Sequence, residues 1–248
     1  KLDSNCELIN PASDPRFQTY WQTYHGIMQR RGVTPDAAKT LVRTATTIIG
    51  ALAVRLGDAD ALIAGPTGRY HRHLEHIQDV LGRAPGVRKF SALSLLILPR
   101  GTIFIADTYV SSDPTAEELV EMTRLAAEQV RRFGVEPRVA LLSHSSFGSA
   151  DSASARKMRG AVALLHAEAP ELEVEGEMHG DAALDEEIRA RIFPGSRLKG
   201  PANLLIMPNL DAANIAFNVL KSMGEGLSAA PLRRTSPPRR SPPAAWST

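Results

Sequence analysis

The stretch RVALLSHSSFGSADSASARKMRGAVALLHAE, residues 138–168, holds the pattern that decides the fold. An apolar run at 138–142 predicts a buried strand, the Ser- and Gly-rich segment 143–151 predicts a loop, and residues near 155–168 predict a helix. The same order recurs twice downstream, with strands at 172–176 and 203–207 and helices near 182–192 and 212–223. Strands that alternate with helices of about ten or more residues are typical of a parallel sheet covered by helices, so we expect an α/β fold.

Residues before this region predict further helices and strands. Thr34-Pro35 places a helix-capping residue before a proline at the first helical position, and apolar residues then recur at helical spacing up to Gly57. A short apolar run at 59–64 predicts a strand. The other expected elements are a helix near 74–82, strands at 90–98 and 102–106 joined by a tight turn, and a helix at 113–134.

Composition excludes several classes of protein. Of the 248 residues, 43% are hydrophobic and 23% are charged, which is typical of a globular chain with one large or two small domains. No run approaches the ~18 apolar residues of a membrane helix, so we expect no membrane partner. Cys6 is the single cysteine, which excludes an internal disulfide and is typical of a cytoplasmic protein.

The positive net charge of +2 comes from the C-terminal segment 229–248, which carries four arginines and no acidic residue. Without those arginines the chain has 25 basic residues against 27 acidic ones, and only 5% of its residues are aromatic. We therefore expect no nucleic-acid partner. Because segment 229–248 also holds five prolines and few apolar side chains, it is predicted to be disordered.

Polar loops follow three of the predicted strands, starting at Ser143, Met178 and Pro208. The carboxyl ends of parallel strands lie at one edge of a sheet, where ligands bind. Loop 143–151 is rich in hydroxyl groups and leads into a helix N-terminus, where free N–H groups favour an anion. The alternative is that the loop, Asp181 and Asn209 only cap helices.

The histidines of the segment HRHLEH, His71, His73 and His76, lie close to Glu75 and raise the possibility of a zinc site. On a helix, however, His71 and His73 point about 200° apart. We therefore interpret this segment as a solvated polar helix face and predict no metal site.

Four stretches together resemble the C-terminal, phosphotransacetylase-like domain of bacterial NADP-dependent malic enzymes, over about residues 9–227. They are IFIADTYVSSDPTAEEL (103–119), LLSHSSFGSADS (141–152), VEGEMHGDAAL (174–184) and LKGPANLLIMPNLDAANIAFN (198–218). The resemblance implies a three-layer α/β/α fold like that of isocitrate and isopropylmalate dehydrogenases. It also implies a partial outer unit at 1–85 and a complete inner unit at 86–228, followed by the disordered tail 229–248.

The resemblance implies a regulatory domain that binds acetyl-CoA or coenzyme A and belongs to a cytoplasmic homo-oligomer. In these enzymes NADP and a divalent metal serve malate oxidation and decarboxylation in an N-terminal half that this sequence does not contain. The residues implied to bind the acyl-CoA are Ser143, Ser145, Gly148, Ser149, Asp181, Asn209 and Asn214.

Departures from the family pattern argue against acyl transfer, so no residue is assigned as catalytic. Two family arginines match Glu75 and Met28 in this sequence, and the family's Ser-Arg…Asp segment has no counterpart after Gly226. An active phosphate acetyltransferase, which transfers acetyl between phosphate and coenzyme A, is the enzymatic alternative. A third possibility is an oligomerisation scaffold without a ligand.

Overall fold

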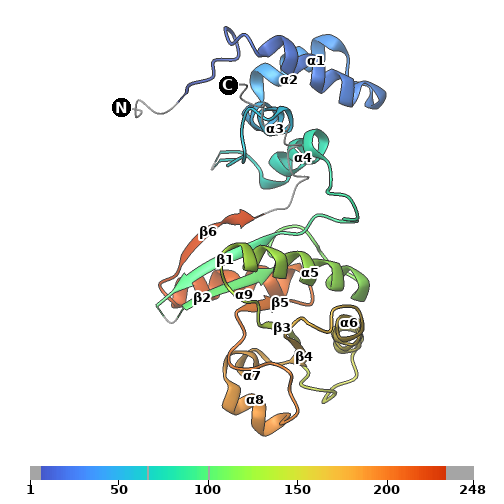
Figure 1. Ribbon diagram of the computed structural model, residues 1–248, viewed down its shortest axis with the longest axis vertical. Coiled ribbons are helices and arrows are strands. Elements are labelled where there is room, and N and C mark those ends of the chain that lie inside the picture. The colour runs from blue at the N-terminus through green and yellow to red at the C-terminus, as the bar shows by residue number, and fades with distance from the viewer. Residues whose placement is uncertain (1–6, 66, 100, 233–248) are drawn as a thin grey trace, which may run out of the picture. The chain divides into compact units, whose positions relative to one another are not determined.

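The computed structural model describes residues 7–65, 67–99 and 101–232 (Figure 1). By its internal contacts the chain divides into two compact units, of which one runs up to Gly86 and the other begins at Val87. Each unit has its own hydrophobic core.

The N-terminal unit is helical over its described residues. Its elements are α1 (Phe17–Met28), the 3₁₀ turn η1 (Gln29–Arg31), α2 (Pro35–Thr44), α3 (Thr46–Leu56) and α4 (Tyr70–Leu81). The core is built around α3, whose side chains Ile48 and Leu52 are fully buried against Tyr20, Tyr24 and Val42. Burial of such aliphatic and aromatic surface is the main stabilising contribution in this unit.

The helix predicted from Thr34 to Gly57 is in fact two helices. Thr34 caps α2 by accepting a hydrogen bond from the Ala37 N–H, and Gly57 ends α3 at a φ of +87°. Between them, Ala45 has extended dihedral angles, and α3 begins again in a new direction. Within the described ranges no single helix is long and apolar enough to cross a membrane, and α2 with α3, bent by 100°, meets that test only as a pair.

The strand predicted at 59–64 is wrong. This segment is irregular, and the side chain of Ile63 is 92% exposed. A strand needs a neighbouring strand to satisfy its backbone groups, and the described part of this unit contains none. An apolar run alone therefore does not make this segment a strand.

The described residues of the C-terminal unit contain a six-stranded sheet with the order β4-β3-β5-β2-β1-β6. Its strands are β1 (Leu93–Leu98), β2 (Gly101–Ala106), β3 (Val139–Leu142), β4 (Val174–Met178), β5 (Leu204–Ile206) and β6 (Leu227–Leu232). The neighbours β4, β3, β5 and β2 pair in parallel, whereas β1 is antiparallel to both β2 and β6. The predicted α/β class is confirmed, but the sheet is mixed rather than parallel throughout.

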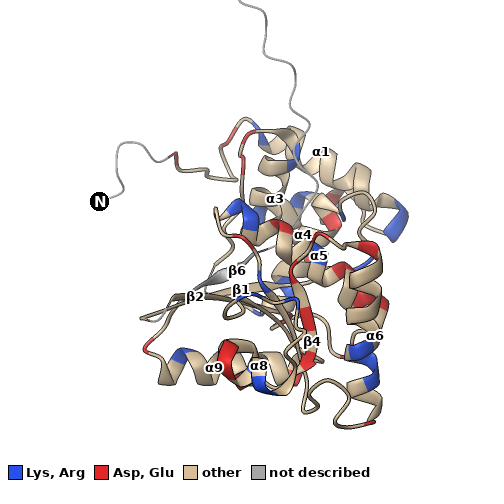
Figure 2. Cartoon of the chain, turned by 60° about the horizontal axis from the view of Figure 1, so that its bottom comes forward, with Lys and Arg blue, Asp and Glu red and all other residues tan. Residues whose placement is uncertain are grey.

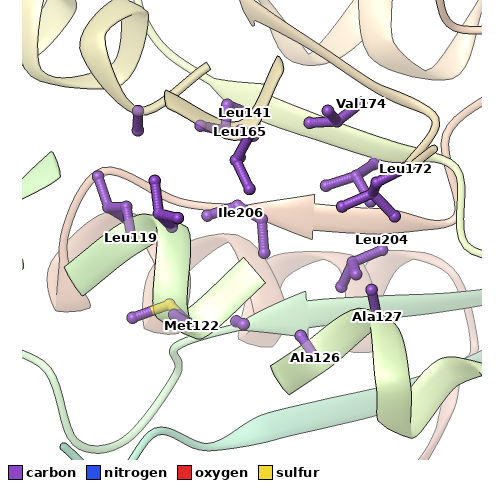
Figure 3. Packing of buried hydrophobic residues seen from close by; sticks show 14 of the residues in the cluster. Leu119, Met122, Ala126, Ala127, Leu141, Leu165, Leu172, Val174, Leu204 and Ile206 are labelled. Carbon is purple, nitrogen blue, oxygen red and sulfur yellow. The ribbon is translucent and has the colours of Figure 1, made fainter. Parts of the chain in front are cut away.

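Helices pack on both faces of this sheet, because successive apolar side chains of a strand point to opposite faces. Phe104, Val139 and Leu204 face the core under α5 (Ala116–Arg132) and α6 (Ala153–Glu168). Figure 3 shows several residues of this core. Ile105 and Leu205 face the opposite core, with α7 (Gly180–Leu184), α8 (Glu186–Ile192) and α9 (Leu210–Met223). Two buried faces explain why these strands are almost wholly apolar.

The helix predicted near 182–192 is divided at Asp185 into α7 and α8. Asp185 has extended dihedral angles, and its carboxylate caps α8 by accepting from the N–H groups of Glu187 and Ile188. Arg189 of α8 is 1% exposed, and its guanidinium donates to the carbonyl oxygens of Ala182, Leu198 and Gly200. Arg189 therefore joins both short helices to the segment that leads into β5.

The disorder predicted for 229–248 is wrong for its first four residues. They belong to β6, whose residues pair with β1 from Ile97 opposite Leu227 to Leu93 opposite Leu232. Backbone pairing to an open sheet edge requires no alternating apolar pattern, so the sequence gives little sign of it. Residues 233–248, the rest of the predicted tail, lie outside the described residues.

Candidate functional site

The loops that follow β2, β3, β4 and β5 emerge at one edge of the sheet, because these four strands are parallel. They are segments 107–115, 143–152, 179 and 207–209. The predicted site loops therefore share an edge with a fourth loop, after β2, that the sequence did not single out. This is the edge at which α/β proteins bind ligands.

Loop 143–151 is tied to the end of β4 by backbone hydrogen bonds. The Ser143 N–H donates to the Met178 carbonyl at 2.8 Å, and the Phe147 N–H donates to the Glu177 carbonyl at 2.8 Å. In the other direction, the His179 N–H donates to the Ser146 hydroxyl at 3.1 Å. The first two predicted site loops thus form one hydrogen-bonded structure.

The carboxylate of Glu177 lies at the centre of this structure, with a side chain that is 1% exposed. It accepts from the Ser145 hydroxyl at 2.7 Å, from the Gly148 N–H at 2.9 Å and from Nε and Nη2 of Arg159 at 3.2 Å each. Arg159 comes from α6, which packs against β4, and Figure 2 shows acidic residues on β4 beside basic residues on α6. Paired in this way, a buried carboxylate is tolerated.

The surroundings of Glu177 favour its charged form. Burial alone would raise the pKa of its carboxyl group, but the Arg159 guanidinium, the Ser145 hydroxyl and the Gly148 N–H outweigh burial and hold the pKa below its ordinary value of 4.5. Glu177 is therefore a carboxylate at neutral pH. It acts as a fixed acceptor for the loop rather than as a proton donor.

A pH titration of stability should reveal this interaction. A carboxyl group with a lowered pKa in the folded state stabilises the fold above its unfolded pKa, and this contribution is lost as the pH falls through the folded value. As the pH falls from neutral to below the ordinary value of 4.5, the native chain should therefore lose its advantage in unfolding free energy over the Glu177→Gln variant. Urea denaturation of both proteins across this range measures the difference, and two curves that stay parallel would contradict the lowered pKa.

The other two loops form a second hydrogen-bonded pair. The Leu210 N–H at the start of α9 donates to the Ser112 carbonyl at 3.1 Å, and the Asn214 side-chain amide donates to the Thr108 carbonyl at 3.1 Å. Lys157 of α6 connects this pair to the helix that follows loop 143–151. Its Nζ lies 2.5 Å from the Asp113 carboxylate and 2.8 Å from the Pro208 carbonyl.

Several predicted site residues have structural partners. Ser145 is fully buried, and its hydroxyl also accepts from the Ala150 N–H at 3.0 Å. Asn209 caps α9 through the Ala212 N–H, and Asp181 accepts from the Ala182 N–H. The capping alternative, kept open from the sequence, thus holds for Asn209, whereas Asp181 lies inside α7, whose N-terminus has no side-chain cap.

Other predicted residues remain accessible. Ser149 and Gly148 are exposed at the tip of the loop, and Ser143 is half-buried. The Ser149 hydroxyl accepts from the Ser146 N–H at 2.9 Å and lies 3.4 Å from the Ser145 hydroxyl. Ser149 is therefore the most exposed serine of loop 143–151, whereas the buried Ser145 supports the loop through its hydrogen bonds.

The histidine segment lies on α4 of the N-terminal unit. His73 has both ring nitrogens bonded, Nδ1 to the Thr47 hydroxyl at 2.6 Å and Nε2 to the Thr67 carbonyl at 2.8 Å. No group of three or more His, Cys, Asp or Glu side chains within the described ranges is placed to hold a metal ion.

Sequence reasoning missed Glu177, Arg159, Lys157 and the loop after β2. In that loop the buried Asp107 accepts from the N–H groups of Tyr109, Val110 and Ser111 and from the Ser111 hydroxyl. For Glu177 and Asp107 the available signal was a charged residue within or directly after an apolar strand, because such residues are rarely buried without a set of partners.

Known sequences and solved structures include relatives of this chain. Residues 1–233 match the profile of the phosphate acetyl/butaryl transferase family. The chain belongs to this family. Among solved members, the EutD phosphotransacetylase from Staphylococcus aureus is similar at a TM-score of 0.82 with 28% identity, covering 95% of this chain and 72% of that one.

Within the phosphate acetyl/butaryl transferase family, the chain is similar to parts of malic enzymes. It is 54% identical over 230 residues to the NAD-dependent malic enzyme of Rhizobium meliloti, covering 93% of this chain and 30% of that protein. It is 53% identical over 233 residues to the NADP-dependent malic enzyme of Escherichia coli, covering 94% and 31% respectively. The chain thus spans about a third of the length of these relatives.

Proposed function

We propose that this chain is an acetyl-CoA-binding regulatory domain of a malic enzyme and that it carries out no acyl transfer. The family match and the high identity to malic enzymes support the domain assignment. Helices on both faces of the sheet support the three-layer, dehydrogenase-like arrangement. The proposed ligand-binding edge is formed by the loops that carry Ser143, Ser149 and Asn209.

One observation favours binding without catalysis. Transfer of a phosphorylated acyl group needs cations that hold the phosphate and offset charge developing in the transition state. At the carboxyl edge, the two cations described above are already paired, Arg159 with Glu177 and Lys157 with Asp113. The Ser145 hydroxyl, a possible participant in chemistry, is engaged by Glu177 as well.

An active phosphate acetyltransferase remains the second candidate, because the family and the EutD phosphotransacetylase share this fold. A malic enzyme containing this domain would bind its nicotinamide coenzyme and divalent metal through other parts of the protein. We also propose that the full-length protein is a cytoplasmic homo-oligomer. The exposed apolar side chains Ile215, Val219 and Met223, spaced four residues apart on α9, support an interface.

Two measurements on the purified chain test the proposal. Isothermal titration calorimetry should show saturable binding of acetyl-CoA, and Ser149→Ala should weaken this binding. Ser222→Ala, at the C-terminal end of α9, should leave the binding unchanged. With acetyl phosphate and coenzyme A, the rate of acetyl-CoA formation should lie at least about a hundredfold below that of a phosphotransacetylase, the typical loss when one charge-stabilising donor is missing.

The outcomes separate the three candidates. Turnover at the rate of a phosphotransacetylase, lost on changing Ser149, would establish the enzyme. Neither binding nor turnover, combined with a stable oligomer, would establish the scaffold.

A further inference from the structure

The shape of loop 143–151 depends on hydrogen bonds to residues outside the loop. Its tip is conformationally unusual: Phe147 has a φ of +49° and Gly148 a φ of +90°. A positive φ is uncommon for a residue other than glycine. Phe147 therefore persists in this conformation only where the surroundings hold it, whereas glycine adopts a positive φ freely.

Glu177 provides that support from beneath the tip. The N–H of Gly148 donates to one carboxylate oxygen, and the N–H of Phe147 donates to the main-chain carbonyl of the same glutamate. The same carboxylate oxygen accepts from the Ser145 hydroxyl, which in turn accepts from the Ala150 N–H. One glutamate thus fixes both sides of the tip.

The carboxylate itself is held in place by α6. Nε of Arg159 faces one oxygen of Glu177, and Nη2 faces the other and also donates to the Ala150 carbonyl at 2.9 Å. Because the Glu177 side chain is 1% exposed, it cannot touch a ligand in solution. Its effect on ligand binding must pass through the loop.

We propose that Glu177 is a positioning residue, which holds the tip of loop 143–151 in the one shape that binds the acyl-CoA. This inference rests on the proposed function. It assigns to Ser145 a supporting role and leaves the contacts with the ligand to exposed groups such as Ser149.

The test uses the full chain, acetyl-CoA as the probe and Glu177→Gln as the main variant. The glutamine can still accept from Ser145 and Gly148, but its amide N–H₂ would face the guanidinium of Arg159. Acetyl-CoA affinity should fall at least about tenfold, the cost of ordering about one backbone residue on binding. Hydrogen exchange at the amides of Gly148 and Ala150 should become faster.

Two further variants separate positioning from a general loss of structure. Combining Glu177→Gln with Arg159→Gln restores a complementary pair of amides and should recover most of the affinity. Glu171→Gln, on an exposed glutamate just before β4, should change neither affinity nor exchange. If Glu177→Gln does not fold, Ser145→Ala removes one hydroxyl, which donates to Glu177 and accepts from the Ala150 N–H, and it should still speed exchange at Ala150 and weaken binding.

Equal affinity of Glu177→Gln and the native chain would overturn the inference while leaving the proposed function intact. Weaker binding with unchanged exchange at Gly148 and Ala150 would also overturn it, because the effect would not pass through the loop. Absence of acetyl-CoA binding by the native chain would overturn the proposed function and, with it, the role given to Glu177.

Discussion

Replacing Arg189 with leucine is expected to lower the free energy of unfolding by about 3–5 kcal/mol. The guanidinium is the donor to three carbonyl oxygens, those of Ala182, Leu198 and Gly200. A buried acceptor left without a donor costs about 1–3 kcal/mol, and leucine can supply no hydrogen bond to any of the three. Because the variant also leaves part of the arginine's volume empty, packing is lost in addition.

Urea denaturation followed by circular dichroism measures this loss. Arg191→Leu is the matched control, because Arg191 lies on the same helix with a side chain that is 78% exposed and only a distant ionic partner in Glu187. It should change stability by less than about 0.5 kcal/mol, as is usual for exposed positions. Similar losses for the two variants would show that Arg189 does not hold this region together.

Replacing Gly176 with alanine should lower the free energy of unfolding by about 3 kcal/mol or more, since backbone strain and overpacking each cost about 1–3 kcal/mol. Gly176 has a φ of +151°, and an added Cβ would lie 2.7 Å from the Leu141 carbonyl oxygen. The backbone of β3 cannot move away without breaking its pairing with β4 next to the register shift. The strand would have to separate where it carries Glu177.

Gly160→Ala provides the opposite control within the same unit. Gly160 lies inside α6, and an added Cβ would meet its nearest neighbour, Ala116, at 3.9 Å. Alanine is favoured over glycine in a helix by about 0.5–1 kcal/mol, so this variant should be more stable than the native chain. The denaturation midpoints of both variants test these two expectations. A Gly176→Ala variant as stable as the native chain would contradict the close packing of β3 on β4.

Much of the fold could be predicted from periodicity. The long helix α5 is expected from its apolar spacing and is fixed by a capping box between Thr115 and Glu118. The strands of the sheet are expected from their apolar runs, since they are buried on both faces. What periodicity could not give is which strands pair, because pairing of β6 with β1 depends on backbone groups far apart in the sequence.

The candidate site was predictable only in outline. The sequence predicts a strand at 172–176, which ends at Gly176. The structure continues β4 through Met178, which makes Glu177 part of the sheet and directs its carboxylate under the neighbouring loop. The sequence of β4 alone cannot show that Glu177 supports the loop, since its partners Ser145 and Arg159 come from other elements.

Strand β6 decides how far the chain can be shortened. It occupies the edge of the sheet beside β1, and the β1 backbone groups that face it are satisfied by residues after Gly226. A version ending before Leu227 would present β1 as an open edge with unpaired N–H and C=O groups, ready to pair with a strand of another molecule. Shortened forms for crystallisation or binding assays should therefore keep residues through Leu232 to avoid strand-mediated self-association.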